Sequence, residues 1–367
     1  MKRTILGNSR NVLKRFAAAT LAAVTLVTAL PGQAFASKAT TSIEDIYISE
    51  NHYAETMKTV AVPYIDAYKQ TGYITGQKNA SLYYEKYVKE DAKGSVVISH
   101  GNGENLEKYD EMIYYFLNMG YSVYGIEHRG HARSGRLGVD NYQIYVESFD
   151  YYYKDLKTFV DQIVIPSSGK ENLYLFAHSM GGGIGARFLE VYPDVFDAAI
   201  LSAPMLEINT GSVPPFFAKL LASGASITPF KNKYVMGDGI FNPDYNFAGC
   251  HTKSEVRYTR AWETRIANPA LQTGGNSYQW LNESFNATKK ATSSSEAKKV
   301  KVPVLLFQAG QDTLVEDGGQ NTFAKYAKDC YVIRFEHAKH EMWGEKDETL
   351  RIYLNRVFSF LDGTLQK

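Results

Sequence analysis

Residues 173–182 read Leu-Tyr-Leu-Phe-Ala-His-Ser-Met-Gly-Gly, and this stretch decides the fold. Its apolar beginning predicts a buried strand, and the residues from Gly181 onward predict a helix. A serine between a strand and a helix, with small residues around it, is typical of a nucleophile elbow. The small residues are needed because so sharp a turn brings the backbone close to its neighbours. Ser179 is therefore the candidate nucleophile.

The sequence on both sides of this turn alternates strand-like and helical patterns. Strands are expected at 82–88, 95–99, 121–126, 173–176, 198–201, 303–307 and 331–335. Helices are expected at 106–117, 145–163, from 181 onward, at 322–328 and at 348–361. Such alternation predicts an α/β fold, with a mostly parallel sheet and helices on both faces.

The alternation stops between residues 205 and 300. An interval of this length is too long for a plain loop, so we expect a largely helical cap over the carboxyl edge of the sheet. The α/β core would then comprise 37–204 and 301–367, with the cap at 205–300. Within the cap, 213–222 is strongly apolar and only Lys219 is charged. It could line an acyl pocket or contact a lipid surface, but a role in the cap's own core is slightly favoured.

A serine nucleophile needs a base, which a carboxylate orients. In this fold the three residues follow the chain order serine, acid, histidine. Asp312 lies just past the strand at 303–307 and is the candidate acid, with Glu316 and Asp317 as competitors. The candidate base is His340, in the loop before the last helix, or His337, nearer the end of the strand.

Two backbone N–H groups are expected to stabilise the oxyanion of the transition state. One belongs to Met180, directly after the serine. The other should come from the loop His100-Gly-Asn-Gly-Glu104, where Asn102 is the candidate. The alternative for this loop is a simple tight turn.

The first 36 residues differ in kind from the rest. Five basic residues precede an uncharged, mostly apolar run at 16–30, and Ala34-Phe-Ala36 follows. This order predicts a secretory signal peptide that is cleaved after Ala36, and the run is short for a membrane span of roughly 20 residues. The protein is therefore expected to be secreted or held in a bacterial cell envelope.

Loss of this leader would leave 35 basic and 39 acidic residues. Such a mildly acidic chain gives no electrostatic reason to expect nucleic acid as a partner. The cysteines, Cys250 and Cys330, are interpreted as buried free thiols in preference to a disulfide. The pairs His128/His131 and His337/His340 lack further ligands at usable spacing, so neither a metal nor an organic cofactor is expected. Nothing in the sequence indicates an oligomeric state.

With these motifs in hand, the chain resembles the bacterial lysophospholipase and monoacylglycerol lipase group of α/β hydrolases, which are serine aminopeptidase-like. The resemblance covers roughly 73–361. It rests on 99–104, 127–136, 177–182, 201–205, 268–271, 274–280, 310–312 and 338–341. It implies that Ser179 is the nucleophile, Asp312 the acid and His340, in preference to His337, the base. It also implies Asn102 and Met180 as oxyanion donors. Ala132 and Ala177 stand where many relatives have glycine, and neither departure removes a catalytic group.

The resemblance implies a secreted serine hydrolase that cleaves an ester of a single-chain lipid, a lysophospholipid or a monoacylglycerol, by acyl transfer. The cap could make transient contact with a lipid surface. A general carboxylesterase or an aminopeptidase is the alternative among enzymes. An aminopeptidase would need an acidic cap pocket, for which Glu255, Glu263 and Glu283 are available. A non-catalytic binding protein is a further alternative, but such proteins usually lose a triad member, and here all three are present.

Overall fold

A computed structural model describes residues 42–169 and 172–365. The predicted signal peptide lies outside the described residues. In the described part of the chain, no helix is both long enough and apolar enough to cross a membrane.

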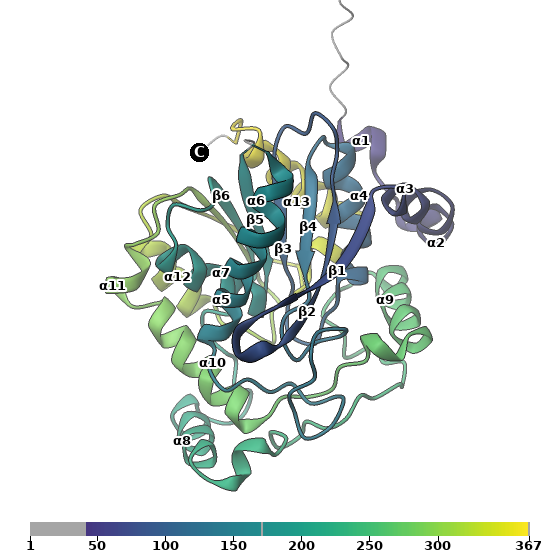
Figure 1. Cartoon of the computed structure of the whole chain (residues 1–367). Coiled ribbons are helices and arrows are strands. Elements are labelled where there is room, and N and C mark those ends of the chain that lie inside the picture. Colours follow the sequence, from purple (N-terminus) through teal and green to yellow (C-terminus); the bar gives the residue numbers. More distant parts are fainter. Residues whose placement is uncertain (1–41, 170–171, 366–367) are drawn as a thin grey trace, which may run out of the picture. The chain divides into compact units, whose positions relative to one another are not determined.

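The described residues form an eight-stranded sheet (Figure 1). Its strands follow the order β1-β2-β4-β3-β5-β6-β7-β8. Only the pairings of β1 with β2 and of β2 with β4 are antiparallel. The strands are β1 (Lys69–Thr75), β2 (Ser81–Tyr87), β3 (Ser95–Ser99), β4 (Ser122–Ile126), β5 (Leu173–His178), β6 (Ala198–Ser202), β7 (Val304–Ala309) and β8 (Cys330–Phe335). The predicted α/β fold with a mostly parallel sheet is confirmed.

Helices cover both faces of this sheet (Figure 1). On one face α4 (Asp110–Asn118) packs on α13 (Asp347–Leu361), where the rings of Phe116 and Phe358 lie 5.5 Å apart. On the other face α5 (Asp150–Phe159) packs on α7 (Met180–Val191), with α12 (Asp317–Tyr326) beside β7 and β8. The strands β3 to β7 are buried along their whole length, because they lie between these two layers.

Several boundaries differ from those expected. The helix predicted at 106–117 begins as a 3-10 turn, Leu106–Tyr109, and becomes α-helical at α4. The helix predicted at 145–163 begins later, at α5, and continues through a π-helical turn at Val160–Val164 into α6 (Ile165–Ser168). The sequence pattern missed β1 and the short helices α1 (Ile43–Ile46), α2 (Tyr53–Thr56) and α3 (Val62–Asp66).

The interval between β6 and β7 contains four α-helices among its described residues. They are α8 (Pro215–Ser226), α9 (Glu255–Ala267), α10 (Tyr278–Ala291) and α11 (Ser294–Ala297). The expectation that residues 213–222 form a cap core is wrong. Phe216, Phe217, Leu220 and Leu221 are each 55–70% exposed, since α8 packs mainly on α10 and buries only Ala222.

Both cysteines are free thiols, as expected. Cys250 is buried, whereas Cys330 is only partly buried at the start of β8. Burial raises the pKa of the Cys330 thiol to about 12, so this group stays protonated at neutral pH.

Candidate active site

Ser179 lies in a strained turn between β5 and α7. Its backbone has φ 53° and ψ −120°, a region that residues other than glycine rarely adopt. Backbone hydrogen bonds hold it there. Its N–H donates to the Ser202 carbonyl over 3.0 Å, and its own carbonyl accepts from Gly183 and Met205. This is the geometry of a nucleophile elbow.

The structure brings Asp312 and His340 together at the carboxyl ends of β7 and β8. The His340 Nδ1 lies 2.6 Å from Oδ2 of Asp312, and both side chains are at least 95% buried. The other carboxylate oxygen accepts from the N–H groups of Leu314 and Val315. Burial raises the pKa of Asp312, but these bonds and the bond with His340 outweigh that effect and lower it. Asp312 is therefore ionised at neutral pH.

A hydrogen bond to an ionised carboxylate puts the ring proton of neutral His340 on Nδ1. The other ring nitrogen, Nε2, is then a proton acceptor. This Nε2 is buried and makes no hydrogen bond within the described residues. An unengaged, basic ring nitrogen is what a general base requires, and its bond to a nucleophile commonly tightens only when substrate binds.

The alternative candidates for the acid and the base differ from Asp312 and His340 in exposure or in bonding. His337 and Glu316 are exposed. Asp317 makes an ion pair with Arg334. Of these candidates, Asp312 and His340 are the pair that combines a short acid–base contact with burial of both side chains.

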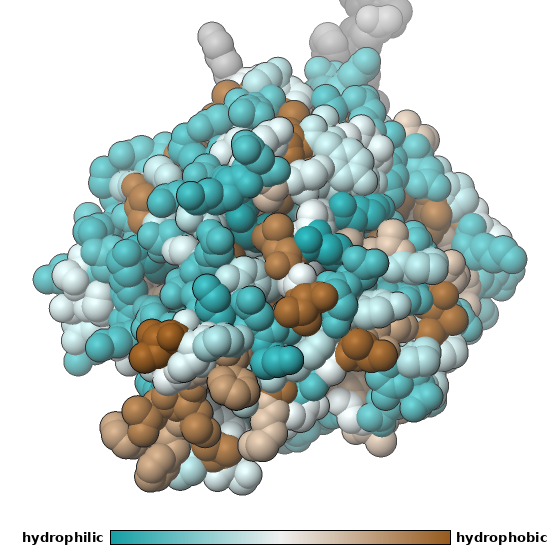
Figure 2. All heavy atoms as spheres, turned by 60° about the horizontal axis from the view of Figure 1, so that its bottom comes forward, coloured by the Kyte–Doolittle hydropathy of each residue, from teal (hydrophilic) through white to brown (hydrophobic). Residues whose placement is uncertain are grey.

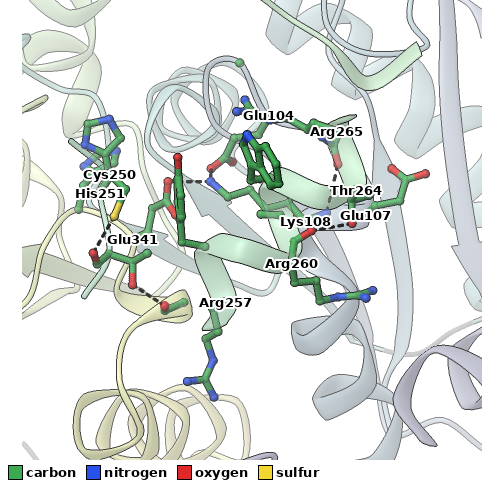
Figure 3. Close-up of a pocket in the computed structure, with 18 of the residues that line it drawn as sticks. Glu104, Glu107, Lys108, Cys250, His251, Arg257, Arg260, Thr264, Arg265 and Glu341 are labelled. Atoms are coloured by element: carbon green, nitrogen blue, oxygen red, sulfur yellow. Dashed lines mark hydrogen bonds and ion pairs between the residues drawn. The ribbon is translucent and has the colours of Figure 1, made fainter. Parts of the chain in front are cut away.

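Ser179 and His340 line one cavity of about 520 Å³. Charged, polar, aromatic and apolar side chains all contribute to its walls, and Figure 3 shows those of α9 and of the helical segment after the oxyanion loop. Of the predicted oxyanion donors, Asn102 lines the same cavity. Met180 is the first residue of α7, where a helix leaves its N–H groups without an intrahelical acceptor.

The loop that carries Asn102 is held by a buried carboxylate. Glu104 accepts from the N–H of Gly101 over 2.6 Å and from the Tyr109 hydroxyl over 2.5 Å. The Asn102 N–H itself has no bonding partner in the described part of the chain, so it is available to a ligand. The side chain of Asn102 donates to Asn276 across the cavity edge, over 2.9 Å.

Lys108 joins this loop to the loop that carries His340. Its Nζ lies 2.8 Å from Glu104 and 2.6 Å from Glu341, the residue after His340 (Figure 3). Burial raises the pKa of Glu104, but Lys108 and His178 outweigh it and hold it well below its usual range. Sequence reasoning missed this network. The one available signal was that Glu104 and Glu341 flank the motifs assigned to catalysis.

A mostly parallel sheet with a nucleophile elbow and a buried Asp–His pair at its carboxyl edge defines the α/β-hydrolase class. A sequence profile described as serine aminopeptidase, S33, matches residues 90–347. The chain belongs to this family and is an ester-hydrolysing enzyme.

Lysophospholipases are among the curated relatives that match most of the chain. Lysophospholipase L2 of Escherichia coli strain K12 is 30% identical over 296 residues, which is 78% of this chain and 86% of the relative. A probable lysophospholipase L2 of Haemophilus influenzae is 26% identical over 323 residues, 86% of this chain and 99% of the relative.

Solved structures show the same fold. A monoacylglycerol lipase of Paleococcus ferrophilus superposes with a TM-score of 0.60 at 23% identity, covering 77% of this chain and 99% of that one. A soluble variant of the Saccharomyces cerevisiae monoglyceride lipase, in complex with a substrate analogue, gives 0.64 at 17% identity, covering 82% and 96%.

The Asp312–His340 contact generates the first prediction. Asp312→Asn should lower kcat for a soluble p-nitrophenyl ester by about 10³- to 10⁴-fold, because an amide cannot stabilise the imidazolium or enforce the Nδ1 proton. The matched control is Asp317→Asn, which removes a neighbouring carboxylate and should keep near-wild-type kcat. Steady-state kinetics on both variants checks this, and a loss below tenfold in Asp312→Asn would contradict it.

Proposed function

We propose that the protein cleaves esters of single-chain lipids by a Ser-His-Asp mechanism. The observation that carries this proposal is the unengaged Nε2 of buried His340 on the wall of the cavity that Ser179 also lines. Ser179 Oγ attacks the ester carbonyl while Nε2 takes its proton, and Asp312 stabilises the resulting imidazolium. The imidazolium gives this proton to the alcohol oxygen as the ester C–O bond breaks, and the alcohol leaves. The neutral histidine then takes a proton from water, which attacks the acyl-enzyme, and returns it to Ser179 Oγ as the fatty acid is released.

The N–H groups of Met180 and Asn102 stabilise the oxyanion in both steps. Losing one donor of this kind costs about 10² to 10³ in rate. The Glu104 carboxylate contributes indirectly, because it fixes the Gly101 N–H and thereby the course of the loop at Asn102. The reaction uses only groups of the chain itself, and no cluster suited to a metal ion occurs among the described residues.

Lipid esters with one acyl chain are the substrates that the comparisons support. Relatives over most of the chain are named lysophospholipase L2, and similar structures are described as monoacylglycerol and monoglyceride lipases. An aminopeptidase remains the alternative, because Asp244, which lies between β6 and β7, contributes a carboxylate to the cavity. None of the cap glutamates Glu255, Glu263 and Glu283 lines it, and Glu283 instead accepts from the N–H of Phe149.

A substrate panel tests the activity. We expect the wild type to release fatty acid faster from a long-chain lysophospholipid and a monoacylglycerol than from a short-chain ester or a peptide amide. Ser179→Ala should lose activity on every substrate and should lose labelling by a fluorophosphonate probe. Cleavage of the short ester alone would refute the lipid substrate but would not contradict Ser179 as the nucleophile. Unchanged labelling in Ser179→Ala would refute the nucleophile.

We further propose that α8 contacts the lipid surface that presents the substrate. Figure 2 shows apolar side chains gathered on this part of the molecule. They include Phe216, Phe217, Leu220 and Leu221 of α8 and, beyond it, Ile227 and Phe230, all at least 55% exposed. Residues 208–237 contain three lysines and no acidic residue. An apolar face with positive charge suits an anionic bilayer.

Vesicle sedimentation tests this contact. The wild type should bind vesicles that contain anionic lipid more tightly than neutral vesicles, and Phe216→Ser/Leu220→Ser should reduce binding by at least about tenfold. Val60→Ser/Ile352→Ser, which replaces exposed apolar residues outside the cap, is the control and should bind like wild type. Equal binding of all three proteins would show that α8 is not the contact.

We also propose that the protein is exported and that cleavage after Ala36 produces its mature form. The leader's order of basic, apolar and small residues supports this. Expressed in a bacterial host, the protein recovered from the medium or the envelope should begin at Ser37 by N-terminal sequencing. Ala34→Tyr/Ala36→Tyr should accumulate uncleaved because bulky residues do not fit the cleavage site. A wild-type chain that stays in the cytoplasm with residues 1–36 attached would overturn the proposal.

A further inference from the structure

The cavity beside Ser179 contains a cation that makes no ion pair within the described residues. Four lysine or arginine side chains line this cavity, namely Lys108, Arg257, Arg260 and Arg265 (Figure 3). The first three are bonded to carboxylates. Lys108 lies between Glu104 and Glu341, Arg257 pairs with Glu111 over 3.0 Å, and Arg260 pairs with Asp110 over 2.7 Å.

Arg265 differs from these three. Within the residues that the structure describes, its guanidinium makes no ion pair and no hydrogen bond. Its guanidinium carbon lies 5.3 Å from the centroid of the Phe241 ring. Arg265 is half-buried, and this burial lowers its pKa, with Tyr258 and Glu341 compensating only in part. Five hydrogen-bond donors are therefore partly withdrawn from water without an acceptor.

The position of Arg265 is nevertheless well defined. It lies in the last turn of α9, and its backbone carbonyl accepts from the Gln272 side chain over 3.1 Å. The loop at Gln272 is tied in turn to the core, because Arg136 donates to the carbonyls of Ala270 and Gln272. A fixed backbone and an unpaired guanidinium together make a site prepared for an external anion.

Guanidinium groups bind phosphate through paired, parallel hydrogen bonds, and they are less strongly hydrated than ammonium groups. A monoacylglycerol carries no anion, whereas a lysophospholipid carries a phosphodiester a few bonds from its ester carbonyl. We propose that Arg265 binds the phosphodiester of a lysophospholipid whose ester carbonyl lies at Ser179, and thereby favours phospholipids over neutral glycerides. This inference rests on the proposed function and assigns its head-group specificity to one residue.

Kinetics on two substrates tests the assignment. The substrates are a lysophosphatidylcholine and a monoacylglycerol with the same acyl chain, short enough to stay monomeric so that α8 plays no part. Arg265→Gln should lower the ratio of kcat/KM for the phospholipid to that for the glyceride by about 10- to 100-fold, mainly through KM. Because it is a ratio, a fraction of inactive protein cancels. A change below threefold overturns the proposal.

Two further variants sharpen the result. Arg265→Lys keeps the positive charge but loses the paired N–H donors of the guanidinium. Its kcat/KM ratio should therefore lie between those of Arg265→Gln and the wild type. Arg356→Gln removes an exposed arginine of α13 whose side chain makes no hydrogen bond or ion pair within the described residues and lies outside the cavity lining. It should leave the ratio at the wild-type value. An equal fall in Arg356→Gln would mean that net charge, not position, sets the ratio, and would overturn the proposal.

Measuring binding without hydrolysis distinguishes a failure of this inference from a failure of the proposed function. An ether-linked lysophosphatidylcholine cannot be hydrolysed, and calorimetry should show about 10-fold or greater weakening in Arg265→Gln. If Arg265→Gln weakens binding but the wild type does not cleave lysophospholipids, the binding site is confirmed and the proposed activity is refuted. If the wild type cleaves them but both proteins bind the ether lipid equally, the inference alone fails. Displacement by inorganic phosphate at similar concentration would make the site a free-phosphate site and overturn the lipid assignment.

Discussion

The strained backbone of Ser179 is the constraint on which the rest of the site depends. A residue with a side chain in this conformation costs of order 1–3 kcal/mol, which the surrounding structure must offset. It is offset by three backbone hydrogen bonds and by close packing of α7. A Cβ on Gly181 would lie 2.1 Å from the Ser99 carbonyl, and one on Gly183 would lie 2.7 Å from that of Met205. Ser99 precedes the oxyanion loop and Met205 begins the cap interval. The same glycines therefore position the nucleophile, the oxyanion loop and the origin of the cap.

Buried charges extend this arrangement to the histidine. Glu104 and Glu341 share Lys108, although the two glutamates belong to loops far apart in sequence. Burying such a cluster costs desolvation energy, and a well-packed apolar cluster would often be as stable. Removing one member is more costly, because an uncompensated charge is left in the interior. The cluster is thus better understood as fixing geometry. It holds the Gly101 N–H and the backbone beside His340 at a set separation, while Asp312 fixes the ring.

The sequence predicted the parts of this structure that depend on local pattern. Seven strands and the elbow follow from apolar runs and small residues, and chain order gives Asp312 as a candidate acid. The choice of His340 over His337 came from the family resemblance. The edge strand β1 was missed because Lys69–Thr75 has few apolar residues and only Ile74 is buried. The ion network was missed because Lys108 and Glu341 are 233 positions apart, and single charged residues look like solvated ones. The exposure of α8 was missed for a related reason. An apolar helix gives the same pattern whether it packs against protein or is left exposed to meet a lipid surface.

The cap and the catalytic loops cannot be treated as independent parts. The side chain of Asn102 donates to Asn276, whose own N–H donates to Asp238. Asn276 directly precedes the N-cap of α10, and α10 is the helix on which the exposed α8 packs. A short chain of contacts therefore leads from the apolar exterior of the cap to the oxyanion loop. The cavity itself offers both kinds of surface. Arg265 contributes charge to its walls, whereas Trp343 contributes aromatic surface. A polar and an apolar part of one ligand would therefore each find matching walls in it.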